Sequence, residues 1–108
     1  MIRFVDNLPR GTSFEVMGEQ LLRSATSTAA NYRAACRARS KPDFVNKLGI
    51  VEEEADETVF WLEMLQESGK IPEPDVRPLM KEGQEILAIF SASHKTARIT
   101  KACGLPSK

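Results

Sequence analysis

The strongest constraint on the fold is a long amphipathic pattern in the middle of the chain. Seven apolar residues between positions 44 and 65 recur at intervals of three or four, which is the repeat of one helical face. Ser40 supplies an N-cap hydroxyl, Pro42 suits the first turn, and Gly69 suits a left-handed stop. The pattern predicts a helix from about residue 40 to residue 68, with core positions Phe44, Leu48, Val51, Ala55, Val59, Leu62 and Leu65.

A second long helical pattern precedes this one. Thr12 and Glu15 have the spacing of a capping box, in which a hydroxyl and a carboxylate satisfy backbone amides at a helix start. Apolar residues then recur three or four apart to about Ala38, and the small residues in the middle would let a neighbouring helix approach closely. Only a tight corner separates the two helices, so we expect them to pack antiparallel.

The ends of the chain complete a helical fold. A short helix is expected at Ile2–Leu8, ended by Pro9 and Gly11, and a last helix from Val76 to near Ile99. No stretch alternates as a β-strand does. The predicted fold is an all-α, antiparallel up-and-down four-helix bundle with a shortened first helix. We expect a single domain over residues 1–101 and a frayed tail at residues 102–108.

Composition excludes several classes of function. The chain has 15 Lys and Arg against 15 Asp and Glu, so no net charge draws the whole protein to nucleic acid or to a membrane. No apolar run approaches the ~20 residues of a membrane span, and the N-terminal segment does not resemble a signal peptide. Cys36 and Cys103 lie far apart without metal-ligand spacing, so we expect two free thiols in a cytoplasmic protein.

The acidic run at residues 52–57 suggests two kinds of enzyme, and neither pattern is complete. Glu54 and Glu57 have the spacing of a di-iron carboxylate motif without its histidine, and His94 stands alone. Together with Glu53 they also imitate the magnesium-binding helix of all-α nucleotide pyrophosphohydrolases, whose partner helix is missing here. We expect a non-enzymatic protein with no catalytic residue, metal or cofactor, and keep magnesium-dependent nucleotide hydrolysis as an alternative.

Basic residues are concentrated in two places, and both are candidates for contacts with phosphates. Between Leu21 and Pro42 there are cations and no acid, and Arg33 and Arg37 share one helical face. The alternative is structural: Arg39 braces the corner, and the other arginines pair with residues 52–57 or with another subunit. A second cluster near the C-terminus also suits the negative end of the last helix. The candidate nucleic-acid contacts are Arg33, Arg37, Arg39, Lys41, Lys95, Arg98 and Lys101.

Apolar residues outside the core stripe indicate a second packing partner. A helix that is apolar on more than one face needs more than one neighbour. The helix predicted at residues 40–68 has four such residues away from its stripe. We expect them to contact other copies of the chain. They are Ile50, Phe60, Trp61 and Met64.

The two central helices resemble a known family. The matching residues are Gln20, Leu21, Arg23, Ser24, Ala30, Asn31, Arg39, Ser40, Phe44 and Glu57. They are similar to the pattern of the four-helix-bundle family named for proteins encoded in intervening sequences of bacterial 23S ribosomal RNA genes, and the resemblance covers roughly residues 8–101. It implies a ring-forming homo-oligomer, typically a pentamer. Relatives include accessory proteins of diversity-generating retroelements, which resemble basic barrels that bind nucleic acid and a reverse transcriptase.

The chain departs from that family pattern in two ways. Its first helix is about two turns long where the family has about twenty residues, and its net charge is zero where the nucleic-acid-binding relatives are basic. We expect a homo-oligomeric scaffold or adaptor that associates with RNA, DNA or a nucleic-acid-processing protein. The alternative is a purely protein-binding structural module.

Overall fold

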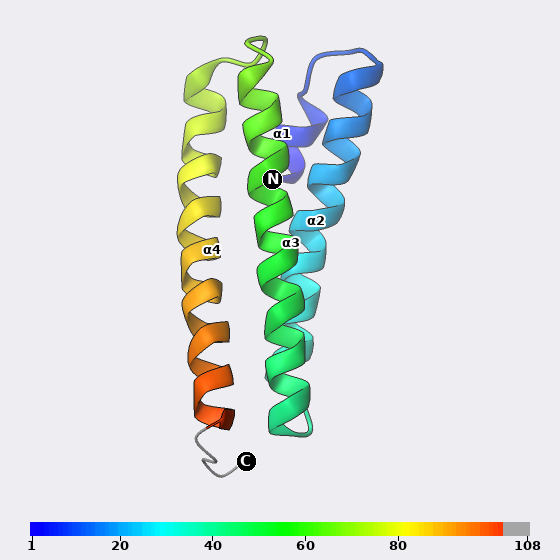
Figure 1. The fold of residues 1–108 in the computed structure, drawn as a ribbon. Coiled ribbons are helices and arrows are strands. Elements are labelled where there is room, and N and C mark those ends of the chain that lie inside the picture. Colours follow the sequence, from blue (N-terminus) through cyan, green and yellow to red (C-terminus); the bar gives the residue numbers. More distant parts are fainter. Residues whose placement is uncertain (103–108) are drawn as a thin grey trace.

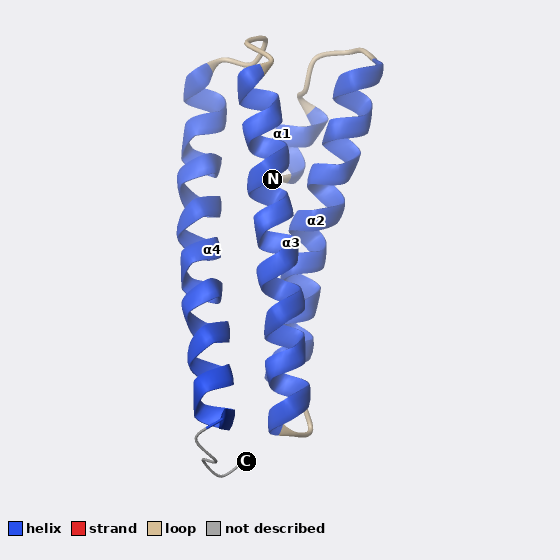
Figure 2. Cartoon of the chain, viewed as in Figure 1, coloured by secondary structure: helices blue, strands red, loops and turns tan. Residues whose placement is uncertain are grey.

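The computed structural model describes residues 1–102, and the side chains of residues 1–99. In this range the chain forms four helices and no strand: α1 (Ile2–Asp6), α2 (Thr12–Cys36), α3 (Lys41–Glu67) and α4 (Glu73–Ala102). The three long helices lie antiparallel with α3 between α2 and α4, and α1 packs against α2 near the upper end (Figure 1). The bundle measures 51 × 19 × 17 Å. The predicted all-α four-helix bundle with a shortened first helix is confirmed (Figure 2).

The helix boundaries confirm one predicted cap and correct another. The Ser40 hydroxyl accepts a hydrogen bond from the Asp43 amide at 3.1 Å, and Gly69 adopts φ 72° after α3, both as expected. The capping box at Thr12 is wrong. Gly11, at φ 135°, is the N-cap residue, so Thr12 is already the first helical residue and its hydroxyl caps nothing.

The last helix is longer than the sequence suggested. It begins at Glu73 rather than Val76 and continues through Pro78. Pro78 is the sixth residue of α4 and has no amide hydrogen, so the helix continues there without the bond that residue 78 would otherwise donate to the carbonyl of residue 74. At the other end the helix reaches Ala102, beyond the expected end near Ile99. The rest of the predicted frayed tail, residues 103–108, lies outside the described residues, as does Cys103; Cys36 is free and exposed.

The buried side chains form two clusters along the bundle. The upper core consists of large residues from α2, α3 and α4: Phe14, Leu21, Val59, Leu62, Leu65, Val76 and Met80. The lower core is smaller and consists of Ala35, Val45, Leu48 and Ala97. Of the seven predicted core positions on α3, six are buried, and Phe44 is half-buried against the lower core.

Two contacts fix how the long helices lie along one another. The buried hydroxyl of Thr58 donates to that of Ser24 at 3.0 Å, which joins the middle of α3 to the middle of α2. At the other interface, a Cβ on Gly49 would lie 3.2 Å from the His94 ring, so the first half of α3 packs against the last part of α4. The C-terminal ends of α2 and α4 therefore lie at the same end of the bundle, where α3 begins (Figure 1).

In the described part of the chain, no helix combines the length and the apolar character needed to cross a membrane.

Candidate nucleic-acid interface

The lower end of the bundle is strongly basic. It is built from residues 31–50, at the α2–α3 corner, and residues 90–99 of α4, which the antiparallel packing brings to the same end (Figure 1). These segments hold a single carboxylate, Asp43. Their cations, which we call the basic end, are Arg33, Arg37, Arg39, Lys41, Lys47, Lys95 and Arg98.

The rest of the described chain has the opposite charge. Residues 1–30 and 51–89 contain fourteen Asp or Glu and six Lys or Arg. A protein with no net charge is therefore polarised along its long axis. The acids begin with Glu52, two residues after the basic segment of α3, where its carboxylate contacts His94 of the segment 90–99. This separation is visible only after folding, because residues 31–50 and 90–99 lie far apart in the sequence.

Three arginines of the basic end have no carboxylate partner within the described chain. Arg33, Arg37 and Arg39 are exposed, and none of them forms an ion pair with a described residue. Lys41 is half-buried, with its Nζ atom 5.8 Å from the centroid of the Phe44 ring, a cation–π distance. These guanidinium groups are consequently available to acceptors outside the chain.

The alternative in which Arg33 and Arg37 pair with the acidic run of the same chain is wrong. The Ser24–Thr58 contact places residues 52–57 alongside the small residues before Asn31, above these two arginines. The acidic run instead meets a residue nearer the helix start. Arg23 forms an ion pair at 3.0 Å with Glu54 and a second one with Glu57.

This ion-pair network in the upper half is tightly connected. The Trp61 indole donates to the Glu57 carboxylate at 3.1 Å, and this hydrogen bond together with Arg23 holds the pKa of Glu57 below its ordinary value. The same pairing, led by Glu57, raises the pKa of Arg23. Two of the three carboxylates that imitate a magnesium site are therefore occupied by an arginine. Among the described residues, no three His, Cys, Asp or Glu side chains are grouped to hold a metal ion.

His94 marks the boundary between the basic end and the acids above it. Its Nδ1 atom lies 2.7 Å from Glu52 Oε1, and hydrogen bonds from Ser91 and then His94 lower the pKa of Glu52. Arg98 adds an electrostatic contribution to that shift, so it lies on this side of the bundle. Lys95 and Arg98 are exposed, whereas the side chain of Lys101 lies outside the described residues.

Lys47 and the contact between Tyr32 and Phe90 were absent from the sequence prediction of the basic end. Lys47 joins it because α3 runs back along α2, and no local spacing marks it. Tyr32 lies half exposed on the Phe90 ring, with the centroids 5.3 Å apart, and hydrogen bonding to Cys36 raises its pKa. The Tyr32–Phe90 contact joins α2 to α4 above the corner.

Of the predicted subunit contacts, the structure brings three together. Phe60, Trp61 and Met64 lie within about one turn of α3, and the centroids of the Phe60 and Trp61 rings, which meet edge to face, are 4.8 Å apart. Phe60 is 47% exposed and Met64 is 40% exposed. Ile50 lies roughly 15 Å further down the helix and lines a separate hollow with His94. Whether these residues contact another copy stays a prediction.

The fold and these surfaces define a helical-bundle protein with a polarised charge distribution. The family model of the 23S rRNA-intervening sequence protein matches residues 1–92. A solved structure from Bacteroides thetaiotaomicron, a protein of unknown function from the S23 ribosomal protein family, is 36% identical, with a TM-score of 0.75 over 86% of this chain and 83% of that one. No curated protein matches the chain. The chain belongs to the 23S rRNA-intervening sequence protein family.

Proposed function

We propose that this protein is a non-enzymatic, homo-oligomeric scaffold that binds the phosphates of RNA or DNA through its basic end. The observation that carries this proposal is the gathering of seven cations against one carboxylate, with Arg33, Arg37 and Arg39 free of partners in the described chain. Guanidinium groups match phosphate oxygens as bidentate donors. Such cations repel one another until an anion neutralises them.

Assembly would multiply this surface. A ring with rotational symmetry repeats every residue once per subunit and places every basic end on the same side. Weak contacts from single subunits then act together on one strand of nucleic acid. We take the ring to be a pentamer, as the family resemblance implies, with Phe60, Trp61 and Met64 at its contacts. Nucleic acid as partner would place the assembly in the cytoplasm.

The test of nucleic-acid binding is its dependence on salt. The affinity for a fluorescently labelled single-stranded RNA and for a duplex of the same sequence is measured by anisotropy at several salt concentrations. Phosphate contacts release counterions, so we expect log Kd to rise linearly with log salt, with a slope of roughly 0.7 per phosphate contact on a single strand. No binding at low salt, or an affinity independent of salt, would contradict the proposal.

The test of assembly is the mass in solution. Light scattering on the purified protein is expected to give a mass near five times the 12.0 kDa of one chain. Met64→Glu, which puts a charge into the exposed patch on α3, should lower that mass. The matched substitution Val16→Glu, at an exposed apolar position on α2, should leave it unchanged. A wild-type monomer would contradict the ring.

One observation favours a second candidate, a purely protein-binding module. The Phe60, Trp61 and Met64 patch is apolar and flanked by carboxylates, which suits a protein surface better than a phosphate backbone. Under this alternative, the charge reversal Arg33→Glu with Arg37→Glu disturbs assembly, and RNA retention stays at background in both proteins. Salt-sensitive RNA binding by the wild type would exclude this protein-binding alternative.

A further inference from the structure

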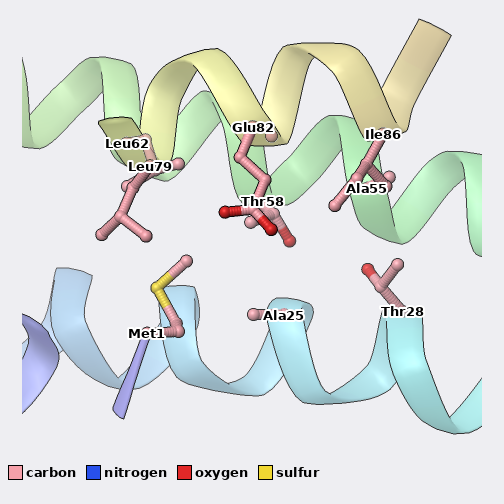
Figure 3. A pocket seen from close by; sticks show the side chains of 10 residues that line it. Met1, Ala25, Thr28, Ala55, Thr58, Leu62, Leu79, Glu82 and Ile86 are labelled. Carbon is pink, nitrogen blue, oxygen red and sulfur yellow. The ribbon is translucent and has the colours of Figure 1, made fainter. Parts of the chain in front are cut away.

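A groove runs between α2 and α4, with α3 as its floor, in the upper half of the bundle. Figure 3 shows its walls: Ala25 and Thr28 on α2 face Leu79, Glu82 and Ile86 on α4. Ala55, Thr58 and Leu62 form the floor, and Met1 closes the upper end. Its volume is about 220 Å³. The basic end plays no part in it.

The groove lies beyond the N-terminal end of α1. α2, α3 and α4 contain 25, 27 and 30 residues, whereas α1 contains 5 and lies beside the first turns of α2. There it packs closely, since a Cβ on Gly18 would lie 2.9 Å from the Leu8 side chain. Met1, just before α1, reaches the groove, which therefore continues the path of this helix. A helix is the element that this surface already accepts at its upper end.

The walls have the spacing that a docked helix needs. Leu79, Gly83 and Ile86 lie four and three residues apart, so they present one side of α4 over two turns. Each of the three helices contributes one small residue, namely Ala25, Ala55 and Gly83. These small residues leave room along two turns of α4 for the anchor side chains of an amphipathic helix at positions i, i+4 and i+7.

The polar atoms of the groove are all acceptors. The Thr28 hydroxyl donates to the Ser24 carbonyl at 2.8 Å, and the single proton of the Thr58 hydroxyl is shared between the Glu54 carbonyl at 2.8 Å and the Ser24 hydroxyl at 3.0 Å, so both protons already have acceptors. The Glu82 side chain extends over the groove in Figure 3. No Lys or Arg lines the groove. The complementary occupant is apolar and carries a cation.

We propose that the groove binds one short amphipathic helix of a partner protein, with two or three apolar side chains inserted and a Lys or Arg directed at Glu82. The α3 patch of another copy is a poor occupant, because Phe60 and Met64 are flanked by Glu57, Glu63 and Glu67, which Glu82 would repel. This binding surface is additional to the basic end and needs neither RNA nor a ring.

The probe is a synthetic helical peptide of about 14 residues, with leucines at the anchor positions and one lysine beside them. Its control is the same peptide with glutamate in place of the lysine. Both are fluorescently labelled and titrated by anisotropy against four proteins: the wild type, Glu82→Lys, Ala25→Trp, and Val16→Trp. Val16 is an exposed position on α2 outside the groove, so its substitution is the matched control for Ala25.

The wild type should bind the lysine peptide at least about tenfold more tightly than the glutamate peptide, and Glu82→Lys should invert this preference. Ala25→Trp fills the groove and should weaken binding about tenfold or more, whereas Val16→Trp should not. Equal affinity for the two peptides in both the wild type and Glu82→Lys would overturn the proposal. A second result would also overturn it. If the wild type binds neither peptide and is a dimer in solution, and Ala25→Trp dissociates that dimer, then a second copy of the chain fills the groove. Glu82→Lys changes only an exposed side chain and keeps the test valid even if Ala25→Trp fails to fold.

Discussion

The two halves of the bundle differ in packing and in charge. The upper half buries large side chains such as Leu62, Leu65 and Val76 completely, and Arg23 binds two of its carboxylates. The basic end has a core of one leucine, one valine and two alanines, and Arg33, Arg37 and Arg39 form no ion pair with a described residue. One half therefore contributes most of the stability, while the charge of the other half remains available for binding.

This division explains how the fold tolerates the repulsion among the cations of the basic end. Cations gathered at one end oppose folding, and apolar burial must exceed that cost. Because most of the burial occurs in the upper half, the basic end is able to accumulate charge. Measurements that compare matched positions in the two halves test this division.

The largest effect is expected from core truncation. Leu62→Ala removes a fully buried side chain from the upper core and should cost about 4 kcal/mol of unfolding free energy, within the range known for such cavities. Leu48→Ala makes the same change in the lower core, where the site borders a hollow, and should cost about 2 kcal/mol. Urea denaturation gives both values. An equal or reversed order would contradict the division.

A smaller effect is expected at the buried contact between α2 and α3. Thr58→Val removes the hydrogen bond to Ser24 and should cost about 1 kcal/mol. Thr26→Val is the control, because the hydroxyl of Thr26 is exposed and bonds only to carbonyls of its own helix. Its unfolding free energy should equal that of the wild type within error. A loss as large for Thr26 as for Thr58 would show that helix propensity, not the contact, is responsible.

The sequence predicted the helices well and the charged contacts poorly. The repeat from Phe44 to Leu65 and the Ser40 cap are local signals, and both led to correct elements. The predicted ion-pair partners of the acidic run were wrong because ion pairs depend on the axial alignment of α2 with α3. The Ser24–Thr58 contact fixes this alignment. The same axial alignment, together with the antiparallel direction of α4, brings the cations of the basic end together. The capping box failed because Gly11 adopts a positive φ that favours glycine.

Substitution of one arginine in each half should change Tm differently. Arg23→Gln frees Glu54 and Glu57 and should lower Tm slightly, by less than Thr58→Val does, because Arg23 is largely exposed. Arg33→Gln, in the basic end, should leave Tm unchanged or raise it, since it removes repulsion without breaking an ion pair. Calorimetry at low salt measures both shifts. A fall in Tm for Arg33→Gln equal to that for Arg23→Gln would indicate a hidden partner for Arg33.

The smallest effect concerns acid stability. Because the fold lowers the pKa of Glu52 and Glu57, the unfolded chain takes up their protons first as pH falls. Their contribution to the unfolding free energy is complete above pH 4.5, the ordinary pKa of a glutamate carboxyl group, and is lost progressively as pH falls below it. Glu52→Gln should therefore weaken the pH dependence of the unfolding free energy below that value. Glu63→Gln, at an exposed position on the same helix, should retain the wild-type profile.

The most direct test of the basic end compares two charge reversals of equal size. Arg33→Glu with Arg37→Glu changes two exposed cations one turn apart at the basic end, and Arg77→Glu with Lys81→Glu does the same in the acidic half. RNA affinity is measured at low salt on proteins of the same solution mass. We predict a loss of at least about tenfold for the first pair, together with a shallower salt dependence, and less than about twofold for the second. Equal losses for both pairs would mean that the basic end is not the binding surface.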